Sequence, residues 1–118
     1  MTIVRHKPSR VSSKCVEGGG LVITTGIAND TSNDIKVQTQ RILDDIEELL
    51  IAAGSNKASI LYAQIWLTDI RMRDAMNEVY FAWVDNKHLP ARACVEARLA
   101  DPKNLVEIQV TAVKSTIG

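Results

Sequence analysis

The C-terminal part of the chain contains Pro90-Ala91-Arg92-Ala93-Cys94-Val95-Glu96, followed by Val106-Glu107-Ile108-Gln109-Val110. Alternating apolar residues predict strands over 92–99 and 106–113, joined by a turn. Arg92 opens the first strand, and its planar guanidinium can bind a carboxylate through two parallel hydrogen bonds. Glu107, on the polar face of the second strand, could transfer a proton or orient a water. The stretch therefore predicts the end of a β-sheet and a candidate site.

Upstream of this stretch, the N-terminal half predicts a hairpin followed by a long helix. A β-branched run at 21–25 is expected to pair with a strand around Cys15. A polar loop over 27–33 follows, and its start has the character of either loop or strand. Apolar residues then recur on one helix face for about five turns. These residues are Ile35, Ile42, Leu43, Ile46, Leu49, Leu50 and Ala53. The pair Ser32-Asn33 contains the expected N-cap, and Gly54 is the expected end.

The central part predicts one more strand, over 58–68, and a second helix before Pro90. Asp69 is the expected cap of this helix. Its apolar stripe consists of Ala75, Met76, Val79, Tyr80, Trp83 and Val84. Because each helix separates strands, the order predicts crossovers that join parallel strands, and the short final turn makes the last strand antiparallel to the one before it. The two helices are expected to cover one face of the sheet. The chain of 118 residues is expected to form a single domain over 1–118.

Composition and charge argue against several classes of function. Lys and Arg number 14, as do Asp and Glu, so the formal net charge is zero, whereas nucleic-acid-binding proteins usually carry a basic excess. No apolar run approaches the ~20 residues that span a bilayer, and no apolar stretch follows the basic N-terminus as in a signal peptide. The two cysteines and two histidines have no ligand spacing, which predicts no metal site. The expectation is a cytoplasmic protein without nucleic-acid or membrane partners.

The predicted sheet leaves one face uncovered, because the two helices cover only the other. By alternation, this face carries Tyr62, Gln64, Trp66, Cys94, Gln109 and Thr111. An exposed face with Trp and Tyr is typical of a partner surface; the alternative is that Trp66 turns to the core. Arg92 and Glu107 begin strands of opposite direction, which predicts a separation on the order of 20 Å. A site that uses both must then form between subunits of a closed ring.

Three other residues are candidates for the same site, each with a structural alternative. Cys94 lacks a histidine at a spacing typical of thiol catalysis, so we expect a small buried residue that offers its backbone N–H. Asn77 lies on the second predicted helix, either towards the site or as an ordinary polar position. Thr25 ends a strand, where its hydroxyl faces the site or only stabilises the turn.

The chain, from about Ile3 to Val113, resembles the RidA/YjgF/UK114 family of small enamine and imine deaminases. The family pattern of a Pro-x-Arg-x-x-Val strand followed by a Val/Ile-Glu-Ile strand matches the two segments quoted above. The stretch 21–26 looks like the family's ITSGQ-type strand. Further matches are Ala53-Gly54-Ser55 at a helix end, and Asp69, Met76-Asn77 and Tyr80 in the second-helix pattern.

The resemblance implies a chorismate-mutase-like α+β fold, assembled as a homotrimer with sites in the clefts between subunits. Members hydrolyse reactive enamines and imines, such as 2-aminoacrylate, to 2-keto acids and ammonia, and need no cofactor. The resemblance further implies that Arg92 binds the substrate carboxylate, that the backbone N–H of Cys94 bonds near the imine, and that Glu107 positions the attacking water. Thr25 stands where members often have serine, and Asn77 would line the cleft.

One departure concerns the N-terminal region. Many members carry an aromatic residue, usually tyrosine, near Ser12 or Ser13, whereas residues 11–14 include none. Retention of Arg92 keeps a deaminase as the leading hypothesis, and the missing aromatic residue leaves the substrate open. The alternatives are a non-catalytic protein that binds 2-keto acids or another small ligand, and a nucleic-acid-acting protein. Neutral charge and a content of two Trp, two Tyr and one Phe argue against the last.

Overall fold

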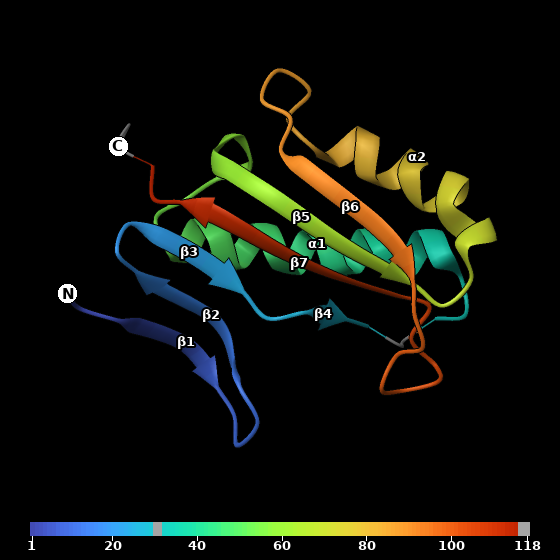
Figure 1. Ribbon diagram of the computed structural model, residues 1–118, viewed down its shortest axis with the longest axis horizontal. Helices are drawn as coiled ribbons and strands as arrows, with labels where there is room; N and C mark the ends of the chain where they lie inside the picture. The colour runs from blue at the N-terminus through green and yellow to red at the C-terminus, as the bar shows by residue number, and fades with distance from the viewer. Residues whose placement is uncertain (30–31, 116–118) are drawn as a thin grey trace.

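The computed structural model describes residues 1–29 and 32–115. The strands and helices are β1 (Val4–Pro8), β2 (Ser13–Gly18), β3 (Leu21–Thr24), β4 (Ile27–Ala28), α1 (Ile35–Ala52), β5 (Ile60–Leu67), α2 (Arg73–Trp83), β6 (Ala91–Glu96) and β7 (Val106–Val113). Short 3-10 turns, Lys57–Ser59 and Ile70–Met72, precede β5 and α2. In Figure 1 the sheet lies in front of α1, and α2 lies beside β6.

Seven strands of the described residues form one mixed sheet. Their order is β1-β2-β3-β7-β5-β6, and β4 also pairs with β7. β6 runs parallel to β5, whereas β7 runs antiparallel to both β3 and β5. The parallel pair follows from the crossover through α2, which returns the chain to the same end of the sheet. The predicted α+β fold, a mixed sheet with two helices packed on it, is confirmed, and β6 lies at one edge.

Asp34, one residue beyond the predicted pair, caps α1. Its carboxylate accepts hydrogen bonds from the backbone N–H groups of Lys36 at 2.8 Å and Val37 at 3.2 Å. These amides have no partner within the first helical turn, and an aspartate at this position satisfies them. Gly54 follows the helix with a φ of 79°, in the left-handed region that glycine adopts without strain, so the predicted helix end is confirmed.

The core lies between the helices and one face of the sheet. The α1 stripe is confirmed, and its most buried members Ile42, Leu43, Ile46 and Leu50 are 0% exposed. The alternation predicted for the last strand is also observed, since its even-numbered residues from Val106 to Ala112 are buried and the others are half-buried.

Among the described residues, neither helix combines the length and apolarity that a bilayer crossing requires.

One strand end and one whole strand differ from the sequence prediction. β6 ends at Glu96 instead of Leu99, because its ladder partner β5 ends at Leu67, whose carbonyl accepts the last bond from Ala97 N–H at 2.9 Å. β1 was not predicted, because this edge strand is mostly exposed and lacks a buried apolar face. The strand character allowed at the start of the 27–33 loop is observed as β4, and residues 30 and 31 of the loop lie outside the described part of the chain.

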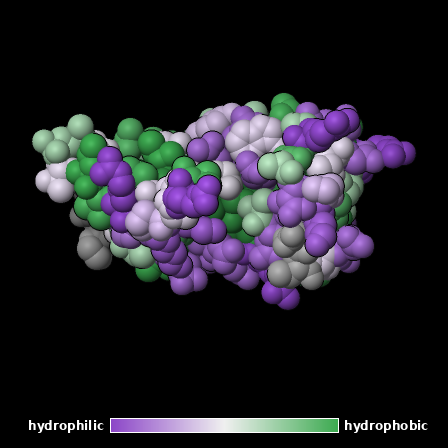
Figure 2. Space-filling view, turned by 90° about the horizontal axis from the view of Figure 1, so that it is seen from below, coloured by the Kyte–Doolittle hydropathy of each residue, from purple (hydrophilic) through white to green (hydrophobic). Residues whose placement is uncertain are grey.

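The sheet face opposite the helices carries aromatic side chains, as predicted. The register pairs Tyr62 with Thr111 and Gln64 with Gln109, and Tyr62 is 37% exposed. Trp66 is half-buried and lies outside the core cluster. Figure 2 shows the molecule from below, where green hydrophobic atoms are concentrated on the left between purple patches and hydrophilic atoms predominate on the right. On the sheet face opposite the helices and at the N-terminus, the exposed apolar residues include Ile3, Val4, Leu21, Ile23 and Val95.

The prediction that Cys94 lies on this uncovered face is wrong. Cys94 pairs with the wholly buried Ile65, and side chains of paired residues leave the same face of a sheet. The thiol therefore packs against the core on the helix side. Alternation correctly predicts that every second residue of β6 shares a face. Which of the two alternating sets faces the helices is decided by the register of β6 with β5.

Candidate functional site

Arg92 lies between β6 and α2, on the helix side of the sheet. Its register partner is the buried Ala63, and a guanidinium N–H donates to Asn77 Oδ1 at 2.7 Å. The guanidinium carbon lies 4.8 Å from the ring centroid of Tyr80 and 5.7 Å from that of Phe81. The hydrogen bond and the cation–π contacts thus hold the Arg92 guanidinium in one orientation. Several of its five N–H donors are left for a ligand.

No carboxylate of the described residues forms an ion pair with this half-buried guanidinium. A cation partly removed from water is stabilised by an anion, and the charge-assisted bidentate pair with a carboxylate is the strongest such contact. The surroundings of Arg92 therefore favour a small anionic ligand at this position. The structure brings together two predicted site residues here, Arg92 and Asn77.

Cys94 lies two residues after Arg92 on β6, and its thiol and its backbone N–H differ in what they could offer a ligand. Burial raises the pKa of the Cys94 thiol, although the positive charges of Arg92 and Arg73 act in the opposite direction. A thiol with a raised pKa is a poor nucleophile at neutral pH, because the thiolate is the reactive form. Since Ala97 N–H points towards β5, alternation along β6 directs the Cys94 N–H to the open edge, beside Arg92.

Glu107 lies on the opposite, uncovered face of the sheet. It pairs with Trp66 of β5 and with Ala28 of β4. Its carboxylate lies over Gly26, where an added Cβ would collide with it. The preceding residue, Thr25, is half-buried and donates its backbone N–H to Lys14 O at 2.9 Å. Thr25 and Glu107, two further predicted site residues, are thus brought near each other through Gly26.

A hollow of about 270 Å³ adjoins Glu107 on this face. Trp66 and the chain segment from Ala97 to Ala100 form the rest of its lining. A carboxylate beside an open hollow can accept a proton from a water held there. This second group of residues therefore has the chemistry of a general base, whereas the group around Arg92 has that of a carboxylate-binding site.

The structure corrects the predicted distance between the two groups. Arg92 pairs with Ala63 and Glu107 with Trp66, so three residues along β5 and two strand spacings place their Cα atoms roughly 14 Å apart, not on the order of 20 Å. The predicted placement at opposite ends is wrong because β6 begins beside Tyr62, in the interior of β5. The two side chains leave opposite faces, so one small substrate cannot contact both within one chain.

Two aromatic residues beside Arg92 were not predicted to act in the site. Tyr80 belongs to the predicted apolar stripe of the helix, whereas Phe81 lies outside that stripe and is 54% exposed. Their spacing from Asn77, three and four residues along α2, is the signal that places all three on adjoining parts of one helix surface.

As for metals, the described residues include no group of histidine, cysteine, aspartate or glutamate side chains that could hold an ion.

Gly26→Ala is expected to displace the Glu107 carboxylate with little effect on folding. The added Cβ meets the Cδ of Glu107 at 2.9 Å and its Cγ at 3.2 Å, and this flexible side chain can move away from a backbone that alanine tolerates. If Glu107 acts on the reacting atoms, a displacement near 1 Å lowers kcat/KM by up to about a hundredfold. Steady-state kinetics and a thermal unfolding curve check both parts.

Gly18→Ala is the matched control, because a Cβ there makes only ordinary contacts, at 3.7 Å or longer. It should leave kcat/KM unchanged. Equal activity in the two variants would show that the position of Glu107 over Gly26 does not matter for the reaction.

Comparisons with known proteins cover nearly the whole chain. Residues 3–114 match the family model described as Endoribonuclease L-PSP. A RutC family protein of Haemophilus influenzae is 39% identical over 114 residues, which cover 95% of this chain and 98% of the relative. The RutC family protein YoaB of Escherichia coli is 39% identical over 112 residues, with coverages of 95% and 98%.

Solved structures give the same result at the level of the fold. A YjgF family member from Neisseria meningitidis superposes with a TM-score of 0.94 at 40% identity, covering 98% of this chain and 97% of that one. A member of the YjgF/YER057c/UK114 family from Mycobacterium tuberculosis gives a TM-score of 0.87 at 28% identity, with coverages of 95% and 99%. Sequence and fold thus point to one group of proteins.

Proposed function

Because the chain belongs to the RidA/YjgF/UK114 family, we propose that it hydrolyses reactive enamines and imines of the 2-aminoacrylate type to 2-keto acids and ammonia. The observation that carries the proposal is the environment of Arg92, whose guanidinium is oriented by Asn77 and by two aromatic rings and has no carboxylate partner among the described residues. An imino acid supplies the missing carboxylate. No cofactor is needed, because water adds directly to an imine carbon.

The reaction divides between the two groups of residues. Arg92 binds the substrate carboxylate, Asn77 holds the guanidinium in place, and the edge N–H of Cys94 donates to the substrate near its imine nitrogen. Glu107 orients a water and accepts its proton as the oxygen bonds to the imine carbon. That proton passes to nitrogen and gives a carbinolamine. The proton of the new hydroxyl then also moves to nitrogen, the carbon–oxygen double bond forms as the carbon–nitrogen bond breaks, and the products are ammonia and a 2-keto acid. Thr25 contributes its hydroxyl on the Glu107 side.

This division requires two subunits, so we propose a homotrimer in which Arg92 of one chain faces Glu107 of the next. The support is that the two side chains leave opposite faces of one sheet and that Tyr62, Ile23 and Val95 are exposed on the face without helices. A closed ring buries such a face without leaving an unpaired copy. We further place the protein in the cytoplasm, without nucleic-acid or membrane partners.

Light scattering is expected to give three times the chain mass of 13.0 kDa at micromolar concentration. Val95→Glu introduces a charge at an exposed apolar position of the sheet face and should lower both the mass and the activity. Circular dichroism of the variant checks that each chain remains folded. A parent protein with the mass of one chain would contradict the shared site as well as the trimer.

The single experiment that tests the function is an assay of hydrolysis across several freshly generated amino-acid imines, with Arg92→Ala as the reference variant. We expect turnover in the parent and its loss in the variant. The second candidate, a non-catalytic protein that binds 2-keto acids through the same Arg92, predicts saturable binding without turnover. The guanidinium contacts favour both, and only the catalytic hypothesis uses Glu107.

A further inference from the structure

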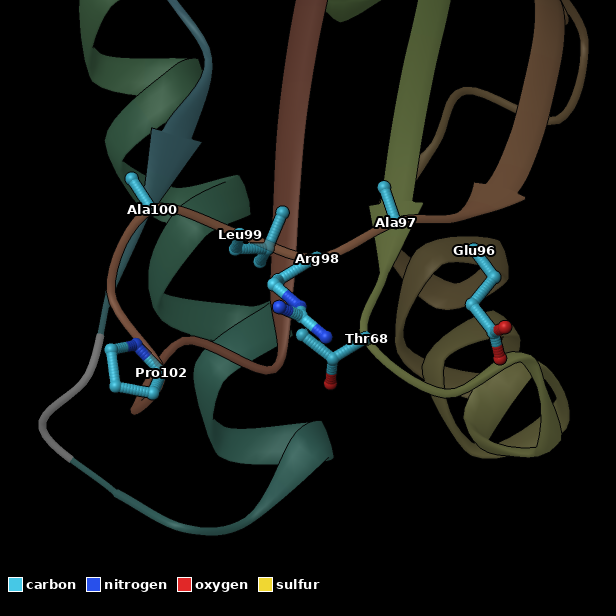
Figure 3. A pocket seen from close by; sticks show the side chains of 7 residues that line it. All are labelled: Thr68, Glu96, Ala97, Arg98, Leu99, Ala100 and Pro102. Carbon is cyan, nitrogen blue, oxygen red and sulfur yellow. The ribbon is translucent and has the colours of Figure 1, made fainter.

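A second hollow, away from Arg92 and much larger than the one beside Glu107, opens where β5 and β6 end and shares the segment Ala97 to Ala100 with that smaller hollow. Its volume is about 740 Å³. Its walls come from Thr68, directly after β5, and from the segment Glu96 to Ala100 with Pro102. Figure 3 shows that the side chains of Glu96 and Arg98 extend in the same direction, on either side of Thr68. The proposed imine hydrolysis assigns no role to any of these three residues.

The polar groups of this hollow carry opposite charges. Glu96 accepts one hydrogen bond, from Ile70 N–H to its Oε1 at 2.9 Å, and this bond leaves its second carboxylate oxygen for another donor. Arg98 is exposed and forms no ion pair with a carboxylate of the described residues. Instead of pairing with each other, the two charges stand apart across Thr68.

The base of the hollow is held in place by backbone contacts. Thr68 donates its N–H to Leu105 O at 3.0 Å, and its hydroxyl lies 3.4 Å from the same carbonyl. Leu105 is in turn bound through its N–H to Gln38 Oε1 at 2.8 Å, from a side chain that is 0% exposed. Leu105 therefore connects Thr68, at the base of the hollow, to Gln38 of α1. Leu99, Ala100 and Pro102 give the remaining wall an apolar character.

We propose that this hollow binds a free α-amino acid. The ligand carboxylate pairs with Arg98 beside Thr68, the ammonium group pairs with Glu96, and an aliphatic side chain lies against Leu99 and Pro102. A ligand with both charges pairs with Glu96 and Arg98 at once, whereas a ligand with a single charge pairs with only one of them. A vicinal amine and carboxylate occur together in a free amino acid, whereas a peptide terminus offers one of them. This inference goes beyond the proposed hydrolysis and does not depend on it.

Isothermal titration calorimetry with L-leucine tests the proposal on the full chain. The controls are 4-methylpentanoic acid, which lacks the amine, and 3-methylbutylamine, which lacks the carboxylate. We expect saturable binding of leucine and at least about tenfold weaker binding of either control, because each loses one charge-assisted contact. Arg98→Gln and Glu96→Gln should each weaken leucine binding to a similar extent. The glutamine at position 96 keeps the acceptor for Ile70 N–H, so the local fold is preserved.

Arg92→Ala separates this site from the proposed imine site. Leucine binding should be the same in this variant as in the parent, whether or not the protein hydrolyses imines. The proposal is overturned if leucine produces no saturable heat at millimolar concentration, or if 4-methylpentanoic acid binds as tightly as leucine. Loss of leucine binding in Arg92→Ala would also overturn it, because the ligand would then occupy the site beside α2.

Discussion

Arg92→Lys is expected to reduce kcat/KM for imino-acid hydrolysis by about one to two decades. Lysine keeps the positive charge but cannot form two parallel hydrogen bonds with a carboxylate, and it does not stack as a plane against Tyr80 and Phe81. A lost charge-assisted hydrogen bond costs about 1.5–3 kcal/mol, which corresponds to that range. Steady-state kinetics on freshly generated imines, over several substrate concentrations, measure the effect.

Arg71→Lys is the matched control for this change. Arg71 is exposed and bound to Asp69, with a distance of 2.7 Å between Nη2 and Oδ2, and such surface pairs contribute little. The control should keep the parent kcat/KM. If Arg92→Lys also hydrolyses imino acids at the parent rate, the substrate carboxylate binds elsewhere and the proposed role of Arg92 is wrong.

Glu107→Gln and Cys94→Ser are expected to differ strongly, with the larger loss in Glu107→Gln. An amide can still hold a water but cannot accept its proton, and general acid–base groups contribute roughly 10²–10⁴-fold. Cys94→Ser keeps the backbone N–H at the open edge of β6, and the half-buried thiol has a pKa raised by burial, so most activity should remain. The readout is kcat for both variants on one imine substrate.

The two substitutions distinguish water attack from thiol catalysis, because the two mechanisms predict opposite orders of damage. Light scattering and thermal unfolding should first establish that both variants keep the fold and the assembly of the parent. Activity that disappears in Cys94→Ser but survives in Glu107→Gln would then overturn the proposed attack of water. A similar small loss in both would remove Glu107 from the role of proton acceptor.

Several features of the fold could be predicted from local sequence pattern. The stripe from Ile42 to Leu50 identifies α1, and the strict alternation from Val106 to Val113 identifies both β7 and the polar placement of Glu107. These predictions succeed because the period of apolar residues directly reflects helix or strand geometry. Two segments, 90–95 and 106–108, match one family pattern. This match predicted how the strands are arranged, because the fold of the family is known.

The tertiary structure alone decided how these elements meet. Alternation shows that Arg92 and Cys94 share a face of β6, but only the pairing with Ala63 and Ile65 shows that this face is turned towards the helices. The contact of Arg92 with Asn77 and the 740 Å³ hollow at the strand ends likewise join segments distant in the chain. The physical reason is that periodicity fixes the faces within an element, whereas the register between elements depends on packing of the whole core.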